Sequence, residues 1–389
     1  MLVIRVSNTC YSACAGWWVN GQQEERDSEQ TPVTGRKTPR RRAPTSRDVA
    51  QRAGVSRTVV SFVLNNRPNS GIPKTTCQRV LQAAADLGYR PNRAARSLVS
   101  GQTRQFGVLV GEKRNDAYGD AFLPSLMRGI DTVARENGYR IQFEYLDENA
   151  EQSALASFRE GTTDGMLVWG PSQSSRALEA IVEAGATVIV IGDPATVDCP
   201  SADIDNAAAA RDAVEHLLQH GYRDIALITN VPLSYGTSRA RLAGYLHALE
   251  SAGLRPNADH IVAGELDEES GRRAMTKILV TRPLPRAVFA ASDQVAIGAL
   301  GALLDAGIRV PEDVAIVGFD DLPLVASIHP TLSTVRVPAT ALGRIATQRL
   351  IDLIEGRPVS PKRIILPTKF VARRSCGCKE VQSADTSST

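Results

Sequence analysis

The spacing of apolar residues separates a short helical segment near the start of the chain from a longer segment that alternates between strands and helices. In the first segment, apolar residues recur every three or four positions, as on one face of a helix. Ser46 can cap a helix that reaches about residue 53, and Ser56 can cap a second helix that ends near residue 64. A third helix is predicted from Pro73 to Gly88, since Pro favours the first helical position and Gly the residue after a helix. Its predicted apolar stripe consists of Val80, Leu81, Ala84 and Leu87.

After residue 104, short apolar runs alternate with amphipathic segments of ten or more residues, many of which end at Gly. This alternation predicts α/β architecture, with parallel sheets joined by right-handed helical crossovers. The units are too numerous for one sheet, so we expect two lobes with a ligand cleft at the carboxyl ends of the strands. The predicted strands are Phe106–Val110, Arg140–Tyr145, Gly165–Trp169, Thr187–Ile191, Asp224–Ile228, His260–Val262, Ala287–Ala290 and Val314–Val317.

Charge is distributed unevenly although the net charge is only +3. Residues 36–96 hold 14 Lys and Arg against two Asp, whereas residues 97–389 hold 29 basic and 36 acidic residues. A basic helical module in front of an acidic α/β core indicates that the first part meets a polyanion and the second does not.

Composition excludes several classes of protein. No stretch reaches the roughly 18 consecutive apolar residues of a membrane span. The six Cys are scattered without a CxxC pair, which argues against a disulfide-built secreted module and a zinc finger and favours a reducing cytoplasm. We expect residues 1–44 to be a disordered extension, although a wrongly chosen start codon would also explain the first thirty. Residues 376–389 are expected to be a flexible tail, with no leucine heptads for a coiled coil.

The segment from Asp48 to Asn65 has the pattern of a helix-turn-helix. The small Ala50 allows two helices to approach, Gly54 allows a tight turn, and Val60 can fill the interface. The opposite face of the second helix would then enter the major groove of DNA.

These residues, together with LGYRPNRAARSL (87–98), RLAGY (241–245), ASDQ (291–294) and VGFDD (317–321), resemble the lactose/galactose-repressor (LacI/GalR) family. The resemblance covers roughly residues 45–375. It implies a helix-turn-helix DNA-binding domain at 45–90, a hinge helix and linker at 91–104, and a two-lobed effector-binding core at 105–375. Such a core resembles periplasmic sugar-binding proteins. The family consists of bacterial transcription regulators that bind pseudo-palindromic operator DNA as homodimers.

The resemblance also implies which residues contact DNA. Arg57 and Thr58 match positions that read bases, and Arg57 can bond a guanine with both arms. Phe62 matches a third specificity position, where it offers apolar contact to a thymine methyl; packing against the small helical core is the alternative. The predicted major-groove set is Ser56, Arg57, Thr58, Ser61, Phe62 and Asn65.

A hinge is expected at residues 92–98, a run too short to form a stable helix alone. In the family such a hinge folds against the minor groove, and Leu98 matches a leucine that wedges between base steps. Asn92 and Ala95 complete the predicted hinge contacts.

The expected effector is a sugar or sugar derivative. Arg241 matches the family's effector-binding arginine, and Thr237 lies one helical turn earlier. Asp293 matches a carboxylate that accepts hydrogen bonds from effector hydroxyls, although Arg241 and Asp293 pairing with each other is the alternative. Three further residues, Asp120, Phe122 and Trp169, are candidates around a sugar ring, with a core role as the alternative for Trp169. Asp320 and Asp321 are interpreted as a loop cap.

No enzymatic site is predicted. The five His show no HxH or HExxH spacing, and neither a nucleophile elbow nor a Walker loop occurs. The pair Cys376 and Cys378 could chelate a metal or oxidise, but it is interpreted as part of the tail, so neither a metal nor a cofactor is expected. We predict a cytoplasmic, effector-controlled repressor. A sugar transport protein would need a secretion signal and would lack the basic module, and a nucleotide-dependent enzyme would need a glycine fingerprint after the first strand.

Overall fold

The structure is a computed structural model that describes residues 42–64, 71–90, 97, 101–111, 119–145, 150–172, 176–194 and 197–378. The chain forms two compact units, residues 1–91 and 92–389, and each is described by itself. The predicted extension falls almost entirely outside the described residues, as does most of the hinge. In the described part, no helix has the length and apolar character required to cross a membrane.

The first unit contains three helices, α1 (Ser46–Ala53), α2 (Arg57–Leu64) and α3 (Lys74–Leu87). They pack around the fully buried side chains of Val49 and Val60. The three predicted helices are therefore confirmed.

Two details of that prediction are wrong. The cap of α1 is Thr45 rather than Ser46, because the Asp48 carboxylate accepts hydrogen bonds from both the backbone N–H and the hydroxyl of Thr45. Leu81 is 53% exposed, since α1 and α2 cover the face of α3 that carries Val80, Ala83 and Ala84. Leu81 lies about a quarter turn away from that face.

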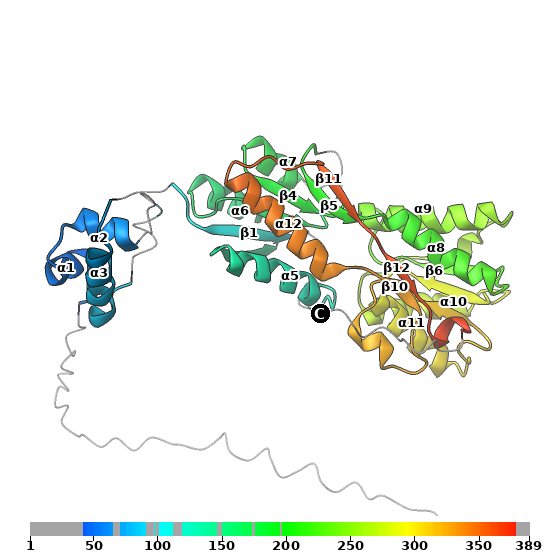
Figure 1. Ribbon diagram of the computed structural model, residues 1–389. Helices are drawn as coiled ribbons and strands as arrows, with labels where there is room; N and C mark the ends of the chain where they lie inside the picture. The colour runs from blue at the N-terminus through cyan, green and yellow to red at the C-terminus, as the bar shows by residue number, and fades with distance from the viewer. Residues whose placement is uncertain are drawn as a thin grey trace, which may run out of the picture. The chain divides into compact units, whose positions relative to one another are not determined.

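The first lobe of the core is a six-stranded parallel sheet in the order β11-β5-β4-β3-β1-β2 (Figure 1). Helices α5 and α12 pack on one face, and α6 and α7 pack on the other. Its strands are β1 (Gln105–Val110), β2 (Arg140–Tyr145), β3 (Met166–Trp169), β4 (Val188–Ile191), β5 (Ser201–Ile204) and β11 (Arg363–Leu366); its helices are α5 (Leu123–Glu136), α6 (Ala150–Arg159), α7 (Arg176–Glu183) and α12 (Ala339–Ile354).

The second lobe is a four-stranded parallel sheet in the order β7-β6-β8-β9. Successive residues of β6 alternate between the layer under α8 and α9 and the layer under α10 and α11. Its strands are β6 (Ile225–Ile228), β7 (Ile261–Val262), β8 (Ala287–Ala290) and β9 (Ala315–Val317); its helices are α8 (Asn206–Gln219), α9 (Gly236–Ser251), α10 (Glu268–Leu279) and α11 (Asp293–Asp305). A separate antiparallel pair joins β10 (Thr334–Arg336) and β12 (Lys369–Val371).

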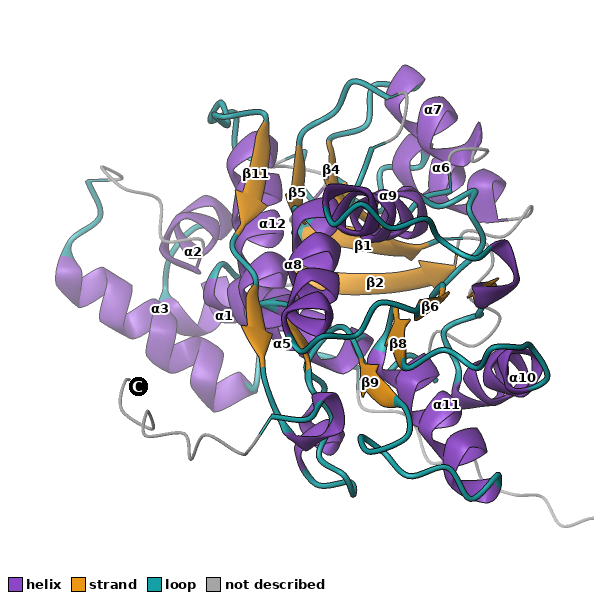
Figure 2. Cartoon of the chain, turned by 90° about the vertical axis from the view of Figure 1, so that its right-hand side faces the viewer, coloured by secondary structure: helices purple, strands orange, loops and turns teal. Residues whose placement is uncertain are grey.

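All eight predicted strands are present, and the two-lobed α/β core is confirmed. The structure adds β5, β10, β11 and β12. The chain passes between the lobes after β5, before α12 and between β11 and β12, and Figure 1 shows β11 and β12 following one another from lobe to lobe. Figure 2 shows β5 and β11 side by side in the first sheet. The core extends beyond its predicted end at residue 375, because Cys376 in the 3-10 turn η3 (Arg374–Cys376) is completely buried.

Helices α10 and α11 cross at glycines. A methyl group on Gly298 would meet the carbonyl oxygen of Glu268 and the backbone nitrogen of Arg272. By contrast, a methyl group on Gly301, one turn later, would meet only the movable guanidinium of Arg272.

We expect Gly298→Ala to lower the free energy of unfolding by about 1–3 kcal/mol, because the two backbones must separate. Gly301→Ala is the matched control and should be neutral or slightly stabilising, because Ala favours helix over Gly by roughly 0.5–1 kcal/mol. Thermal and urea unfolding of the two variants measure this difference, and equal stability would contradict a backbone contact at Gly298.

Candidate functional site

The helix α2 presents a polar face to solvent. The hydroxyl of Ser56 accepts a hydrogen bond from the backbone N–H of Val59 at 3.3 Å, as the predicted cap requires. Gly54 adopts a left-handed conformation, with φ of 63°, that makes the turn between α1 and α2. With Val60 buried beneath the helix, the side chains of Arg57, Thr58 and Ser61 are exposed.

Phe62 is half-buried and does not belong to the side chains that pack around the small helical core in the described part of the unit. Its role in DNA contact therefore stays a prediction. Asn65, Asn92, Ala95 and Leu98 lie outside the described residues, so the hinge contacts also remain predictions.

Both acidic side chains of the basic segment have structural partners. Asp48 caps α1, and Asp86 accepts hydrogen bonds from Arg52 of α1, at 3.0 Å, and from Gln82. The bonds from Gln82 and Arg52 lower the pKa of Asp86, so it stays ionised at neutral pH. Asp86 thus links α1 to α3, whereas Asp48 acts within the cap of α1.

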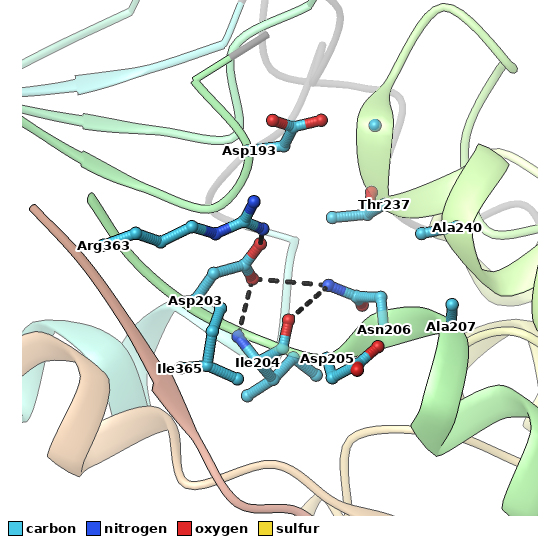
Figure 3. Close-up of a pocket in the computed structure, with 11 residues that line it drawn as sticks. Asp193, Asp203, Ile204, Asp205, Asn206, Ala207, Thr237, Ala240, Arg363 and Ile365 are labelled. Atoms are coloured by element: carbon cyan, nitrogen blue, oxygen red, sulfur yellow. Dashed lines mark hydrogen bonds and ion pairs between the residues drawn. The ribbon is translucent and has the colours of Figure 1, made fainter. Parts of the chain in front are cut away.

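A cavity of about 360 Å³ lies where the two lobes of the core meet, at the carboxyl ends of β4 and β5. Figure 3 shows Asp193 and Arg363 on the side of the first lobe and Thr237 and Ala240 of α9 across from them. The volume is in the range of small-molecule sites. Its polar lining comprises Asp193, Asp203, Asp205, Asn206, Thr237 and Arg363.

Asp203 is the central polar group of this cavity (Figure 3). Its carboxylate accepts hydrogen bonds from the backbone N–H of Ile204 at 2.8 Å, from the Asn206 amide at 3.3 Å and from Arg363 at 3.4 Å. Burial raises the pKa of Asp203 to about 6, although these bonds and the charge of Arg241 oppose the rise. Sequence analysis missed Asp203, because β5 is only four residues long and was not predicted.

A second cavity adjoins the first and shares Asp203, Ile204, Asn206 and Thr237 with it. The structure therefore brings together five of the six predicted effector residues, namely Asp120, Phe122, Trp169, Thr237 and Arg241. The rings of Phe122 and Trp169 stack with centroids 5.9 Å apart. Asn230, Leu266 and Asp320 also line this cavity.

The Arg241 guanidinium is buried at the floor of the second cavity. It donates to the Asn206 side chain at 3.0 Å and to the carbonyl oxygen of Ala291, and it lies 3.7 Å above the Phe319 ring. Asp320 is 4.0 Å away and has a positive φ of 124°. A non-glycine residue in that conformation is strained, and such strain concentrates at functional sites. Asp320 was interpreted as a loop cap, but it lines the cavity.

Asp293 lines neither of these two cavities, and its role in effector binding stays a prediction. Its carboxylate is fully buried and accepts hydrogen bonds from the backbone N–H of Leu322 at 2.8 Å and from the Thr334 hydroxyl at 2.6 Å. Burial raises its pKa to about 6. Because Asp293 begins α11 while these partners follow β9, its bonds join three segments of the second lobe.

The lobes also touch beside the second cavity. The Gln294 side chain, at the start of α11, accepts a hydrogen bond from the backbone N–H of Ala121 and donates one to the carbonyl oxygen of Gly119. These bonds cross from the second lobe to the residues that precede α5. Both hydrogen bonds would break if the two lobes moved apart.

A helix-turn-helix unit followed by a two-lobed, periplasmic-binding-protein-like core defines a DNA-binding transcription regulator. Residues 45–92 match the family "Bacterial regulatory proteins, lacI family", and residues 214–376 match the "Periplasmic binding protein-like domain". The transcriptional regulator CelR of Thermobifida fusca is 33% identical over 340 residues, which cover 86% of this chain and 99% of CelR. The chain belongs to the lacI family of bacterial regulatory proteins and is a transcription regulator, not an enzyme.

Other relatives and solved structures agree with this assignment. Catabolite control protein A of Priestia megaterium is 30% identical, covering 84% of this chain and 98% of that protein. A structure of the CelR–cellobiose complex has a TM-score of 0.67 at 30% identity and covers 85% of this chain and 99% of that one. The lac repressor dimer bound to operator and the anti-inducer ONPF has a TM-score of 0.76 at 27% identity, covering 86% and 99%.

Asp203 should make stability depend on pH. Its pKa is higher in the folded protein than the ordinary 3.8, so ionising it costs stability; the cost is absent below about pH 4 and complete above about pH 6. We expect Asp203→Asn to raise the free energy of unfolding at pH 7 by about 1–3 kcal/mol relative to the parent, and by much less at pH 4.

Urea unfolding at both pH values tests this, with the exposed neighbour Asp205→Asn as the control. Asp205 caps α8 through the backbone N–H of Ala208, and Asn can keep that cap. Asp293 is present in all three proteins, so its own titration cancels. A gain from Asp203→Asn that does not differ between the two pH values would contradict the assigned cause.

Proposed function

We propose that this regulator is a repressor whose affinity for its operator is controlled by a small carbohydrate bound between the core lobes. The observation that carries the proposal is the lining of the paired cavities, where carboxylates, amides and a guanidinium surround a stacked pair of aromatic rings. Sugars present hydroxyls that both donate and accept hydrogen bonds, and C–H faces that pack on aromatic rings. Both kinds of partner line the same space.

The cavity also contains a polar atom that lacks a partner. The Asn230 side-chain oxygen is buried and has no hydrogen-bond partner among the described residues. A buried acceptor left unpaired costs roughly 1–3 kcal/mol. We infer that an effector hydroxyl donates to this oxygen, with Asp203, Asn206, Thr237 and Arg241 as further partners.

The relatives support a sugar as effector. The structurally similar CelR was solved with cellobiose, and the lac repressor with the anti-inducer ONPF. For this chain we propose a sugar of one or two rings, because the first cavity has a volume of about 360 Å³ and shares four lining residues with the second.

We propose that two copies of the chain bind a pseudo-palindromic operator. A helix-turn-helix protein matches such a site by two-fold symmetry, and the similar lac repressor structure is a dimer on its operator. Arg57 and Thr58, exposed at the start of α2, are the proposed base contacts.

Effector binding would act through the arrangement of the lobes. A ligand shifts this arrangement only by binding one form more strongly than the other. The Gln294 bonds to Gly119 and Ala121 are the contacts that depend directly on lobe separation. Mobility-shift assays on DNA upstream of the gene, with and without a panel of mono- and disaccharides, test the proposed function; a complex that no sugar alters would overturn the carbohydrate effector.

Arg57→Ala should weaken operator binding by about 1–3 kcal/mol and leave binding to random DNA nearly unchanged, because a base contact is lost. The matched control is Arg79→Ala, which removes the same charge from the exposed surface of α3. Fluorescence anisotropy on operator and random duplexes measures both affinities. Equal losses on the two duplexes would show that Arg57 contacts phosphate only.

Asn230→Leu should reduce sugar affinity at least tenfold without lowering the melting temperature, because it removes an unpaired buried oxygen and keeps the volume. Thr163→Val is the matched control: the Thr163 hydroxyl is also buried and unpaired among the described residues, but it does not line either cavity. Calorimetric titration with the sugar found in the panel is the measurement. Undiminished affinity in Asn230→Leu would exclude Asn230 from the site.

A further inference from the structure

Four potential metal ligands meet at the far end of the second lobe. They are His216 in the last turn of α8, His220 directly after it, and Cys376 and Cys378 near the end of the described chain. Their ligand atoms all lie within 4.8 Å of one another. The pair from α8 and the pair from the chain end are about 160 residues apart in the sequence.

The distances match the edges of one coordination sphere. The Nε2 atom of His216 lies 3.2 Å from the Cys376 sulfur and 3.6 Å from the Cys378 sulfur. The Nε2 atom of His220 lies 3.2 Å from the Cys378 sulfur. Zinc–nitrogen bonds of about 2.0 Å and zinc–sulfur bonds of about 2.3 Å in a tetrahedron place the ligand atoms roughly 3.3–3.8 Å apart.

Local backbone geometry explains why each pair of side chains points to the same place. Residues four apart lie on the same face of a helix, which aligns His216 with His220. Between the two Cys, Gly377 has a left-handed φ of 95°, and this turn brings both sulfurs to the same side. The Cys pair, expected in the tail, instead lies against the end of α8, beside two His whose spacing in the sequence indicated no metal site.

The surroundings suit a structural metal. Cys376 is completely buried, and the Phe370 ring packs 4.2 Å from the ring of His216. Two thiols and two imidazoles are the ligand set of structural zinc sites.

We propose that His216, His220, Cys376 and Cys378 bind one Zn²⁺ ion in a closed tetrahedral site that fastens the end of the core to α8. Each Cys releases its thiol proton on binding, and each His ligates through Nε2, so the site carries no net charge. All four positions belong to the protein, which leaves no open position for substrate. The inference is independent of the proposed sugar effector, because none of the four ligands lines either cavity.

The test uses the full chain, purified with a thiol reductant, stripped of metal and titrated with Co²⁺ and then Zn²⁺. We expect one equivalent of Co²⁺ to give thiolate charge-transfer bands and the intense visible bands of tetrahedral cobalt. One equivalent of Zn²⁺ should abolish these bands and raise the melting temperature. Cobalt binding that remains octahedral, or that occurs only as weakly as at surface carboxylates, would overturn the proposal.

Cys378→Ser and His220→Gln are the informative variants, because both side chains are at least partly exposed and the fold tolerates them better than a change at buried Cys376. Each should weaken Zn²⁺ binding at least a hundredfold and remove the stabilisation by Zn²⁺. Cys77→Ser and His247→Gln, which change the same residue types elsewhere, should behave like the parent. Parent-like cobalt spectra in both site variants, or a Cys376–Cys378 disulfide in chain whose thiols were alkylated at cell lysis, would refute the site.

Discussion

The polar floor of the cavity depends on the buried guanidinium of Arg241. The Arg241 guanidinium bonds to Asn206 at the start of α8 and to Ala291 at the end of β8, and it lies beside Asp320 in the segment that leads to β10. Isolating a charge from water costs several kcal/mol unless partners surround it. The partners of Arg241 come from three places. Asn206 follows the crossing after β5, Ala291 follows β8 of the second sheet, and Asp320 lies in the loop before the next crossing. Satisfying this one group therefore joins three segments of the second lobe and gives the cavity its polar floor.

The same region contains groups that the folded chain satisfies poorly on its own. Asp203 is buried with a raised pKa, the Asn230 oxygen has no partner in the described residues, and Asp320 has a strained backbone. Each lowers the stability of the ligand-free protein, and all three line the cavities. Polar groups of this kind bind a ligand more strongly, because folding has already removed their hydration and ligand binding costs them little more. The unsatisfied groups therefore mark the binding site, and the folding stability that they cost the ligand-free protein is recovered when a ligand binds.

Sequence patterns predicted the architecture because it rests on local periodicity, and all eight long or strongly apolar strands followed from it. Strand β5 was not predicted, because its sequence SADI (201–204) alternates polar and apolar residues over only four positions. Asp203, which lies in this strand, was therefore not predicted either. Asp320 was expected to cap a loop but lines the cavity, because its direction depends on a backbone bend at its positive φ that composition does not encode. The ligands His216 and Cys376 could not be paired, since only folding brings residues 160 positions apart to 3.2 Å.

Two segments join the cavity to the proposed zinc site. Helix α8 begins with Asn206 in the cavity and ends at the two His, and the segment from β11 to η3 begins with Arg363 in the cavity and ends at the two Cys. A helix of fourteen residues is about 21 Å long and transmits displacement as a rigid rod. Helix α8 follows the crossing after β5, and the segment from β11 to η3 contains the crossing between β11 and β12. A metal at their far ends would join β12 and η3 to α8 within the second lobe, whereas Arg363 lies beyond the crossing, in the first lobe. The proposed metal would therefore stiffen the second lobe as a unit and leave the crossing between β11 and β12 as the segment that bends when the lobes move.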